Sequence, residues 1–157
     1  MKKVSDIMTS DVISVTPDVK VAQITRLLVD NHLTGVPVVD EHGIVLGIIT
    51  EEDLIVRVAK LHVPEFVSLL GAIVYLGSEK KLDEEVTKVL ATTAGDLVHA
   101  EKMTSAEDCI GQDATIETLA TLMLERNVNP VPVIDHASKL VGIVSRSDLV
   151  KQIAEQG

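Results

Sequence analysis

The sequence predicts an α+β protein, close to the α/β pattern, built from two copies of one small unit. Two observations predict this class. The segment from Val36 to Asp40 returns as Val131 to Asp135, at an offset of 95 residues, and stretches with a hydrophobic period of two alternate with stretches of period ~3.6 inside each copy. The 157 residues suffice for two small units that depend on each other. Each copy should therefore run strand, helix, strand, turn, strand and helix.

The first copy carries a signal for each of these elements. Val21, Ile24 and Leu28 lie on one face of its first helix. Asp40 suits a hairpin turn, and Thr50 suits the N-cap of the second helix. The expected elements are a strand at 12–15 that ends before Pro17, a helix at 21–31, a turn at 35–37, a strand at 38–39, a turn at 40–43, a strand at 44–49 and a helix at 51–60.

The second copy repeats this order at the same offset. Its expected elements are a strand at 109–110, a helix at 116–126, a strand at 131–134, a turn at 136–138, a strand at 140–144 and a helix at 146–155. The chain before it has two alignments, because Met8–Ser10 matches Met103–Ser105 at an offset of 95 whereas Ser5–Ile7 resembles Gly95–Leu97 at an offset of 90. Both alignments stay open.

An insert separates the two copies. We expect the first copy at 1–59, a mainly helical insert at 60–93 and the second copy at 94–157. The apolar stretch Phe66–Leu76 is shorter than the roughly 20 residues of a membrane-spanning helix, so it should be a core or interface segment. The residues Glu79–Leu90 suit an amphipathic helix.

Composition excludes several classes of function. The net charge of −10 would repel a phosphate backbone, and Phe66 and Tyr75 are the only aromatic residues, so we expect no nucleic-acid partner. A single cysteine, Cys109, excludes an intrachain disulfide and a cysteine-based zinc cluster. The polar start of the chain does not resemble a secretory signal. We therefore expect a cytoplasmic protein without a membrane partner.

Each copy contains the same corner sequence. Gly47–Asp53 and Gly142–Asp148 share glycine, two hydrophobic residues, Thr or Ser, two variable residues and Asp. With the Val-Pro-Val segments before them, these corners make the chain resemble a pair of CBS domains, named for cystathionine beta-synthase, over 4–58 and about 94–153. The insert resembles one found in some stand-alone bacterial and plant CBS-pair proteins. The resemblance implies small three-stranded sheets with flanking helices, packed about a pseudo-twofold axis.

The resemblance also implies two equivalent clefts that commonly bind AMP, ADP, ATP or S-adenosylmethionine as a regulatory ligand. The chemistry of the corners agrees with this implication. Thr50 and Ser145 offer a hydroxyl at a helix start, where the helix dipole favours an anion such as phosphate. Asp53 and Asp148, one helical turn later, can accept both hydroxyls of a ribose. The same residues also fit simple capping boxes, and capping can coexist with binding.

In many members of the family, a cleft combines the strand and turn of one copy with the corner of the other. One expected cleft then unites Thr16, Leu33, Thr34, Gly35, Ser145, Arg146 and Asp148. The other unites Ile110, Gly111, Val128, Asn129, Pro130, Thr50 and Asp53. Gly111 lacks the hydroxyl of Thr16, and Pro130 replaces the usual small residue. The cation Arg146 should favour phosphate in the first cleft, unless it is merely solvated, whereas Glu51 and Glu52 should repel phosphate from the second.

We find no catalytic or metal-binding pattern in the sequence. The five histidines lack ligand spacing, and no phosphate loop or nucleophile elbow occurs. Cys109 lies in an expected strand without a base beside it, so a buried inert thiol is expected. Glu51, Glu52 and Asp53 spread over too wide an arc of a helix to hold a divalent ion together.

The sequence therefore predicts a regulatory protein rather than an enzyme. It should sense an adenosine compound through the relation of its two copies, form a homodimer and modulate an effector protein of unknown identity. The alternative is a structural dimerisation or adaptor protein whose clefts bind no ligand. An accessory with nucleotide-hydrolysing activity is a third, weaker interpretation, because the residues that hydrolysis needs are missing.

Overall fold

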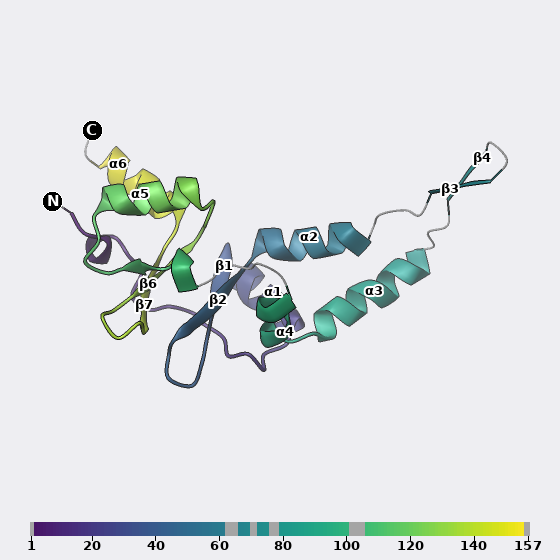
Figure 1. Cartoon of the computed structure of the whole chain (residues 1–157), viewed down its shortest axis with the longest axis horizontal. Coiled ribbons are helices and arrows are strands. Elements are labelled where there is room, and N and C mark those ends of the chain that lie inside the picture. Colours follow the sequence, from purple (N-terminus) through teal and green to yellow (C-terminus); the bar gives the residue numbers. More distant parts are fainter. Residues whose placement is uncertain (1, 62–65, 70–71, 76–78, 101–105, 156–157) are drawn as a thin grey trace.

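The computed structural model describes residues 2–61, 66–69, 72–75, 79–100 and 106–155. Figure 1 shows two small sheets beside each other, with helices on their outer sides and an arm that leads away from the first sheet. Within the described ranges, no helix is both long and apolar enough to cross a membrane. The architecture is a mixture of helices and small sheets, as the sequence predicts.

The first copy follows the predicted order of elements. It contains α1 (Val21–Asp30), β1 (Gly35–Val39), β2 (Val45–Thr50) and α2 (Glu51–Leu61). β1 and β2 pair antiparallel, with Gly35 opposite Thr50. The Asp40 carboxylate closes the turn between them by accepting hydrogen bonds from the backbone amides of His42 and Ile44, at 2.8 and 2.9 Å. Strand β1 also includes the segment 35–37 that the sequence suggested as a turn.

The second copy forms a three-stranded sheet. After the 3-10 helix η2 (Ala106–Asp108) it contains β5 (Ile110–Gly111), α5 (Ile116–Glu125), β6 (Val131–Ile134), β7 (Leu140–Val144) and α6 (Arg146–Ala154). β6 lies in the middle, parallel to β5 and antiparallel to β7. Thr115 caps α5 by accepting a hydrogen bond from the backbone amide of Thr118 at 3.2 Å.

The expected strand at 12–15 is wrong in extent. The structure has only a parallel bridge between Val15 and Val38, with hydrogen bonds from Val15 N to Pro37 O and from Val39 N to Val15 O. Val15 is buried, whereas Ile13 is 36% exposed, so the segment approaches the sheet at a single residue. The sheet of the first copy therefore has two strands and a bridge rather than three strands.

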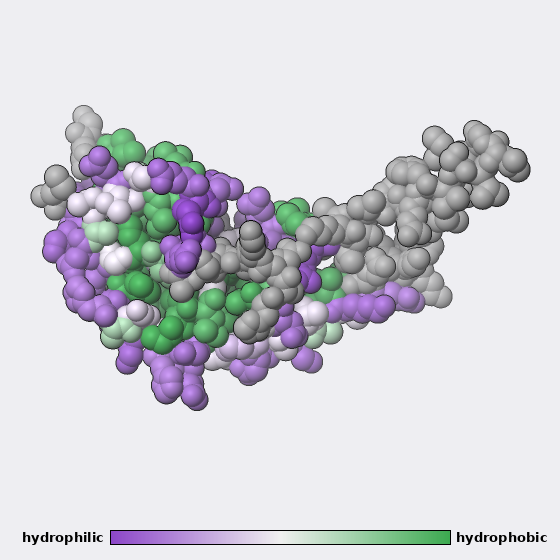
Figure 2. All heavy atoms as spheres, in the orientation of Figure 1, coloured by the Kyte–Doolittle hydropathy of each residue, from purple (hydrophilic) through white to green (hydrophobic). Residues whose placement is uncertain are grey.

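The outer faces of the helices keep large hydrophobic side chains exposed. Val29 on α1 and Ile55 on α2 are 72% and 67% exposed. Leu124 on α5 and Val150 on α6, which lie 95 residues later, are 80% and 63% exposed. Figure 2 shows hydrophobic atoms at the outer edge of the molecule over α5 and α6. The two copies thus expose hydrophobic side chains at equivalent positions.

The first residues of each copy pack into the core of the other copy. The 3-10 helix η1 (Val4–Asp6) places Val4, which is fully buried, in the cluster of Leu119 and Val131. Helix α4 (Ala94–Ala100) places Ala94 and Leu97 in the cluster of the first copy. Backbone hydrogen bonds fix both segments, from Val4 N to Ala114 O at 2.9 Å and from Ala94 N to Val19 O at 2.8 Å.

This exchange selects one of the two alignments left open by the sequence. Ala114 and Val19 are 95 residues apart, whereas their partners Val4 and Ala94 are 90 residues apart. Asp6 and Asp96 also have equivalent roles, since each accepts a hydrogen bond from the backbone amide three residues before it. The two segments therefore correspond at an offset of 90. The competing match, Met103–Ser105, lies outside the described residues.

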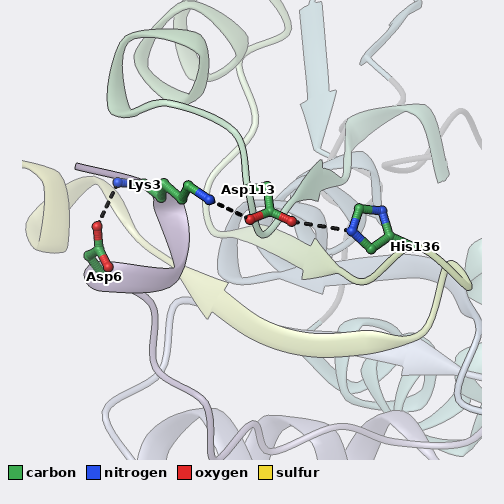
Figure 3. Close-up of polar contacts among 4 residues, drawn as sticks. All are labelled: Lys3, Asp6, Asp113 and His136. Carbon is green, nitrogen blue, oxygen red and sulfur yellow. Dashed lines mark hydrogen bonds and ion pairs between the residues drawn. The ribbon is translucent and has the colours of Figure 1, made fainter. Parts of the chain in front are cut away.

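Polar contacts hold the N-terminal segment on the second copy (Figure 3). The Lys3 Nζ atom lies 2.8 Å from Asp113 Oδ1, and the His136 Nε2 atom lies 3.3 Å from Asp113 Oδ2. The hydrogen bond from Lys3 lowers the pKa of the Asp113 carboxyl. All three side chains are exposed, so these contacts add little to the stability provided by Val4.

The insert contains a hairpin as well as a helix. β3 (Phe66–Leu69) and β4 (Ala72–Tyr75) pair antiparallel, and α3 (Glu79–Ala91) forms the predicted helix. The expectation of a mainly helical insert missed this hairpin, because a short apolar run has no clear period. The side chains of 66–76, expected in a core or interface, lie outside the described residues. In Figure 1, α2 and α3 lead to the hairpin away from the sheets.

The two copies meet at equivalent residues, as a pseudo-twofold axis requires. Ile44 forms an antiparallel bridge with Lys139, 95 residues later. Gly35 approaches its equivalent, Pro130, so closely that a Cβ on Gly35 would lie 2.8 Å from Pro130 Cδ. A glycine is therefore needed where the start of β1 meets Pro130 at the axis.

We expect Val4→Ala to destabilise the protein by about 2 kcal/mol, because it leaves a cavity in a closed core. Urea unfolding measures this loss, with the exposed Val29→Ala as the matched control, for which a change within ~0.5 kcal/mol is expected. Hydrogen exchange should increase in β6 more than in β1. Faster exchange confined to β1 would contradict the exchanged packing.

Candidate functional site

The corner of the first copy is a closed capping box at the start of α2. Thr50 N and Thr50 Oγ1 both donate to Asp53 Oδ2 at 2.8 Å, and Asp53 N donates back to Thr50 Oγ1 at 3.2 Å. Thr50 is the last residue of β2, and its hydroxyl accepts a hydrogen bond from the Asp53 amide, which has no partner within the helix. The other carboxylate oxygen, Asp53 Oδ1, accepts no hydrogen bond from any residue that the structure describes.

The corner of the second copy has the same geometry at the start of α6. Ser145 N and Ser145 Oγ donate to Asp148 Oδ2 at 2.8 and 2.7 Å, and Asp148 N donates to Ser145 Oγ at 3.3 Å. Asp148 Oδ1 has no donor among the described residues. Ser147 adds a hydroxyl 2.7 Å from Ser145 Oγ. The capping boxes considered from the sequence are thus present, and each leaves one carboxylate oxygen for another partner.

A pocket of about 170 Å³ joins the two corners. Its lining residues are Thr34, Thr50, Glu51 and Glu52 from the first copy, and Asn127, Asn129 and Arg146 from the second. Thr34 and Asn129 are equivalent under the 95-residue offset, as are Glu51 and Arg146. The pocket therefore lies where the pseudo-twofold axis relates the two copies. It brings together residues that the sequence assigned to two separate clefts.

The first backbone amides of α2 and α6 have different acceptors. In the first copy, the backbone amide of Glu51 donates to the backbone carbonyl of Thr34 at 3.0 Å. In the second copy, the equivalent amide of Arg146 donates to the side-chain oxygen of Asn129 at 2.9 Å. A side chain can rotate away from its donor, whereas the carbonyl is fixed by the backbone. The amide at the start of α6 is therefore the one that a ligand can take over with less rearrangement.

Arg146 is positioned by a neutral partner. Its Nη2 atom donates to Asn127 Oδ1 at 3.0 Å. No described carboxylate forms an ion pair with Arg146. Asn127 was not predicted as a site residue. In the sequence, Asn127 is marked only by its position 95 residues after His32. The feature that the two residues share, a positive φ angle of 52° at His32 and 51° at Asn127, is visible only in the structure.

The other predicted site residues lie outside the lining of this pocket. They include Asp53, Ser145 and Asp148, which are within two residues of lining residues in the chain. Thr16 donates a short hydrogen bond to Asp18, which lowers the pKa of that carboxyl. Ile110 and Gly111 form β5. Leu33 is half-buried, and Gly35, Val128 and Pro130 are buried. Gly35 and Pro130 are in contact at the axis, directly after the pocket residues Thr34 and Asn129 in the chain.

The described residues contain no group of three or more His, Cys, Asp or Glu side chains that could hold a metal ion. Burial raises the pKa of the Cys109 thiol to about 11, and the nearby Asp108 carboxylate acts in the same direction. A thiol with such a pKa is almost entirely protonated at neutral pH, so it is a poor nucleophile.

Known proteins are similar to this chain over most of its length. CBS domain-containing protein CBSX1, chloroplastic, of Arabidopsis thaliana is 31% identical over 94% of the chain, although the chain spans only 62% of CBSX1. Uncharacterized protein MJ1426 of Methanocaldococcus jannaschii is 28% identical over 96% of the chain and 90% of that protein.

Solved structures are similar over nearly the whole chain. The crystal structure of CBSX2 in complex with AMP has a TM-score of 0.71 and 25% identity, and the match covers 99% of this chain and 98% of that one. The CBS-domain containing protein ATU1752 from Agrobacterium tumefaciens has a TM-score of 0.68 and 27% identity, with coverage of 96% and 98%.

The sequence pattern of the CBS domain itself matches twice. The matched residues are 4–60 and 94–155, which include both capped corners and the two exchanged segments. With this repeated match, the protein belongs to the CBS domain family as a tandem pair.

Proposed function

We propose that this protein is a non-catalytic regulatory module that binds an adenosine compound between its two CBS copies and thereby modulates an effector protein. The observation that carries this proposal is the pocket that joins the two capped corners at the pseudo-twofold axis. A ligand in such a pocket contacts both copies at once. Binding therefore favours the relative arrangement of the copies that fits the ligand best.

The corners have the chemistry for a ribose and an anionic group. Asp53 and Asp148 each retain a carboxylate oxygen with no described donor, which suits the hydroxyls of a ribose. Arg146 and the amide now held by Asn129 suit an anion at the start of α6. The complex of the similar protein CBSX2 with AMP supports the adenosine class. AMP, ADP, ATP and S-adenosylmethionine are the candidates.

We expect an adenosine compound to raise the melting temperature of the protein. A ligand at 100 times its Kd adds about 2.7 kcal/mol to the stability, which raises the Tm of a chain of this length by roughly 5–10 °C. Thermal unfolding with millimolar AMP, ADP, ATP and S-adenosylmethionine, with and without magnesium, measures this effect. If no compound shifts the Tm, the protein is better described by the structural alternative.

The variant Asp148→Asn should weaken binding while it preserves the fold. The asparagine oxygen can still accept the hydrogen bond from Ser145 N, but its amide group cannot accept ribose hydroxyls. We expect a loss of about 1.5–3 kcal/mol in binding free energy by calorimetry. Asp53→Asn is the matched variant, and with AMP as the ligand it should lose less, because Glu51 and Glu52 beside that corner repel a phosphate. A larger loss in Asp53→Asn would assign the ribose to the first copy.

The structural alternative has its own support in the outer helices. The hydrophobic residues exposed at equivalent positions of both copies are Val29, Ile55, Leu124 and Val150, together with Ile153 on α6, which is 64% exposed. Hydrophobic side chains on adjacent helices are typical of a surface that another protein covers. We propose that a second copy of the chain covers them in a homodimer, with or without a bound ligand.

We expect the double variant Leu124→Glu/Val150→Glu to be monomeric, with a mass of 16.9 kDa by light scattering, because two buried charges in each partner would oppose the contact. The control is Glu41→Lys in the hairpin turn after β1, where the side chain is 85% exposed. This control should remain dimeric. A wild-type protein that stays monomeric at high concentration would contradict the homodimer.

The raised pKa of Cys109 predicts an unreactive thiol. With a pKa of about 11, Cys109 should hold roughly 100-fold less thiolate at pH 8 than a free cysteine. The rate of alkylation by iodoacetamide should therefore be low at neutral pH and rise as the pH approaches 11. The urea-unfolded chain provides the reactive control. A fast reaction of the folded protein with a midpoint near pH 7 would point to a nucleophile instead.

A further inference from the structure

The charges around the pocket break its pseudo-twofold symmetry. Glu51 and Arg146 occupy equivalent positions, each as the first residue of its helix, yet they carry opposite charges. Glu52 adds a second carboxylate, and its equivalent in the second copy is the neutral Ser147. The lining therefore has two anions on one side and one cation on the other.

These opposite charges do not neutralise each other directly. No ion pair within 4.0 Å joins Arg146 to a described carboxylate, and the guanidinium is held by Asn127 instead. Glu51, Glu52 and Arg146 are all exposed to solvent. A ligand that carries both charges can therefore bridge the pocket, with its anionic group at Arg146 and its cationic group at the two carboxylates.

We propose that the pocket selects an adenosine compound with a zwitterionic, net cationic tail over a nucleotide with a polyphosphate tail. This inference rests on the proposed function, since it assumes that an adenosine compound binds here. S-adenosylmethionine is the probe of this class. Its carboxylate would face Arg146, and its ammonium and sulfonium groups would offset Glu51 and Glu52.

The opposite case, a polyphosphate, fits the same charges poorly. The tail of ATP carries about four negative charges near neutral pH, since each of the three phosphates is ionised once and the terminal one is mostly ionised twice. One guanidinium faces these charges, while two carboxylates on the other wall repel them. The volume of about 170 Å³ is below the ~300 Å³ of a typical pocket for a whole ligand. It suits the tail of the compound, so the charges of the tail decide the selection.

Acidic residues at a helix start also have a purely structural explanation, because they interact favourably with the helix dipole. α5 provides a control for this effect. Glu117 lies in its first turn, and Glu125 ends the same helix. Both line a separate hollow of about 370 Å³ on α5, which shares no residue with the pocket between the two copies. The double variant Glu117→Gln/Glu125→Gln removes as much charge as Glu51→Gln/Glu52→Gln and also alters a helix start.

The experiment is calorimetric titration of the full chain with adenosine, AMP, ATP, S-adenosylmethionine and S-adenosylhomocysteine at fixed ionic strength. We expect S-adenosylmethionine to bind most tightly. It should bind more tightly than S-adenosylhomocysteine, which lacks the sulfonium charge, and ATP should bind most weakly. In Glu51→Gln/Glu52→Gln, the ratio of the Kd for ATP to that for S-adenosylmethionine should fall about tenfold or more. The α5 control should leave this ratio unchanged.

The outcomes separate this inference from the proposed function. If no compound binds, adenosine included, the proposed function fails and this inference fails with it. If adenosine compounds bind but the wild-type protein prefers ATP, the inference is overturned while the proposed function stands. The inference is also overturned if the two double variants change the ratio equally, because the charges would then act at long range rather than in the pocket.

Discussion

The structure depends on the exchange of two short segments between the CBS copies. Val4 completes the core of the second copy, and Ala94 with Leu97 completes the core of the first. The backbone hydrogen bonds to Ala114 and Val19 fix the position of each segment. Each core is therefore complete only with a segment that belongs, by sequence, to the other copy. The relative position of the two copies is therefore set by hydrophobic burial and not only by contact between their sheets.

The geometry of the pocket follows from this constraint. The exchange holds the two copies about a pseudo-twofold axis, and Gly35 and Pro130 meet at that axis in close contact. The residues directly before them, Thr34 and Asn129, then face the same pocket as the starts of α2 and α6. A duplicated sequence thus supplies two corners, and the packing brings them together. The charges differ because only the backbone needs to be equivalent for the two copies to fold alike.

The corner residues combine a structural and a proposed binding role without conflict. Thr50 and Ser145 start their helices, and one oxygen of Asp53 or Asp148 completes the capping box. Each box uses only groups of its own copy, so it caps its helix by itself. The other carboxylate oxygens of Asp53 and Asp148, and the charged residues next to them, take no part in capping. The charges can therefore differ between the two copies. α2 also runs from the pocket towards the arm that carries the β3–β4 hairpin, which places the insert at the other end of this helix (Figure 1).

The sequence alone determined the duplication, the order of elements and the two capped corners, because these depend on local signals. Helix periodicity, turn residues and the Ser/Thr-x-x-Asp spacing act within a few residues of each other. Periodicity failed at 12–15 and 66–75, where a short apolar run fits more than one structure. Tertiary packing alone decided which alignment holds before the second copy, that Val4 belongs to the second core, and that Glu51, Glu52 and Arg146 share one pocket. These facts join residues about 90 or more positions apart, and no local pattern specifies which distant surfaces are buried together.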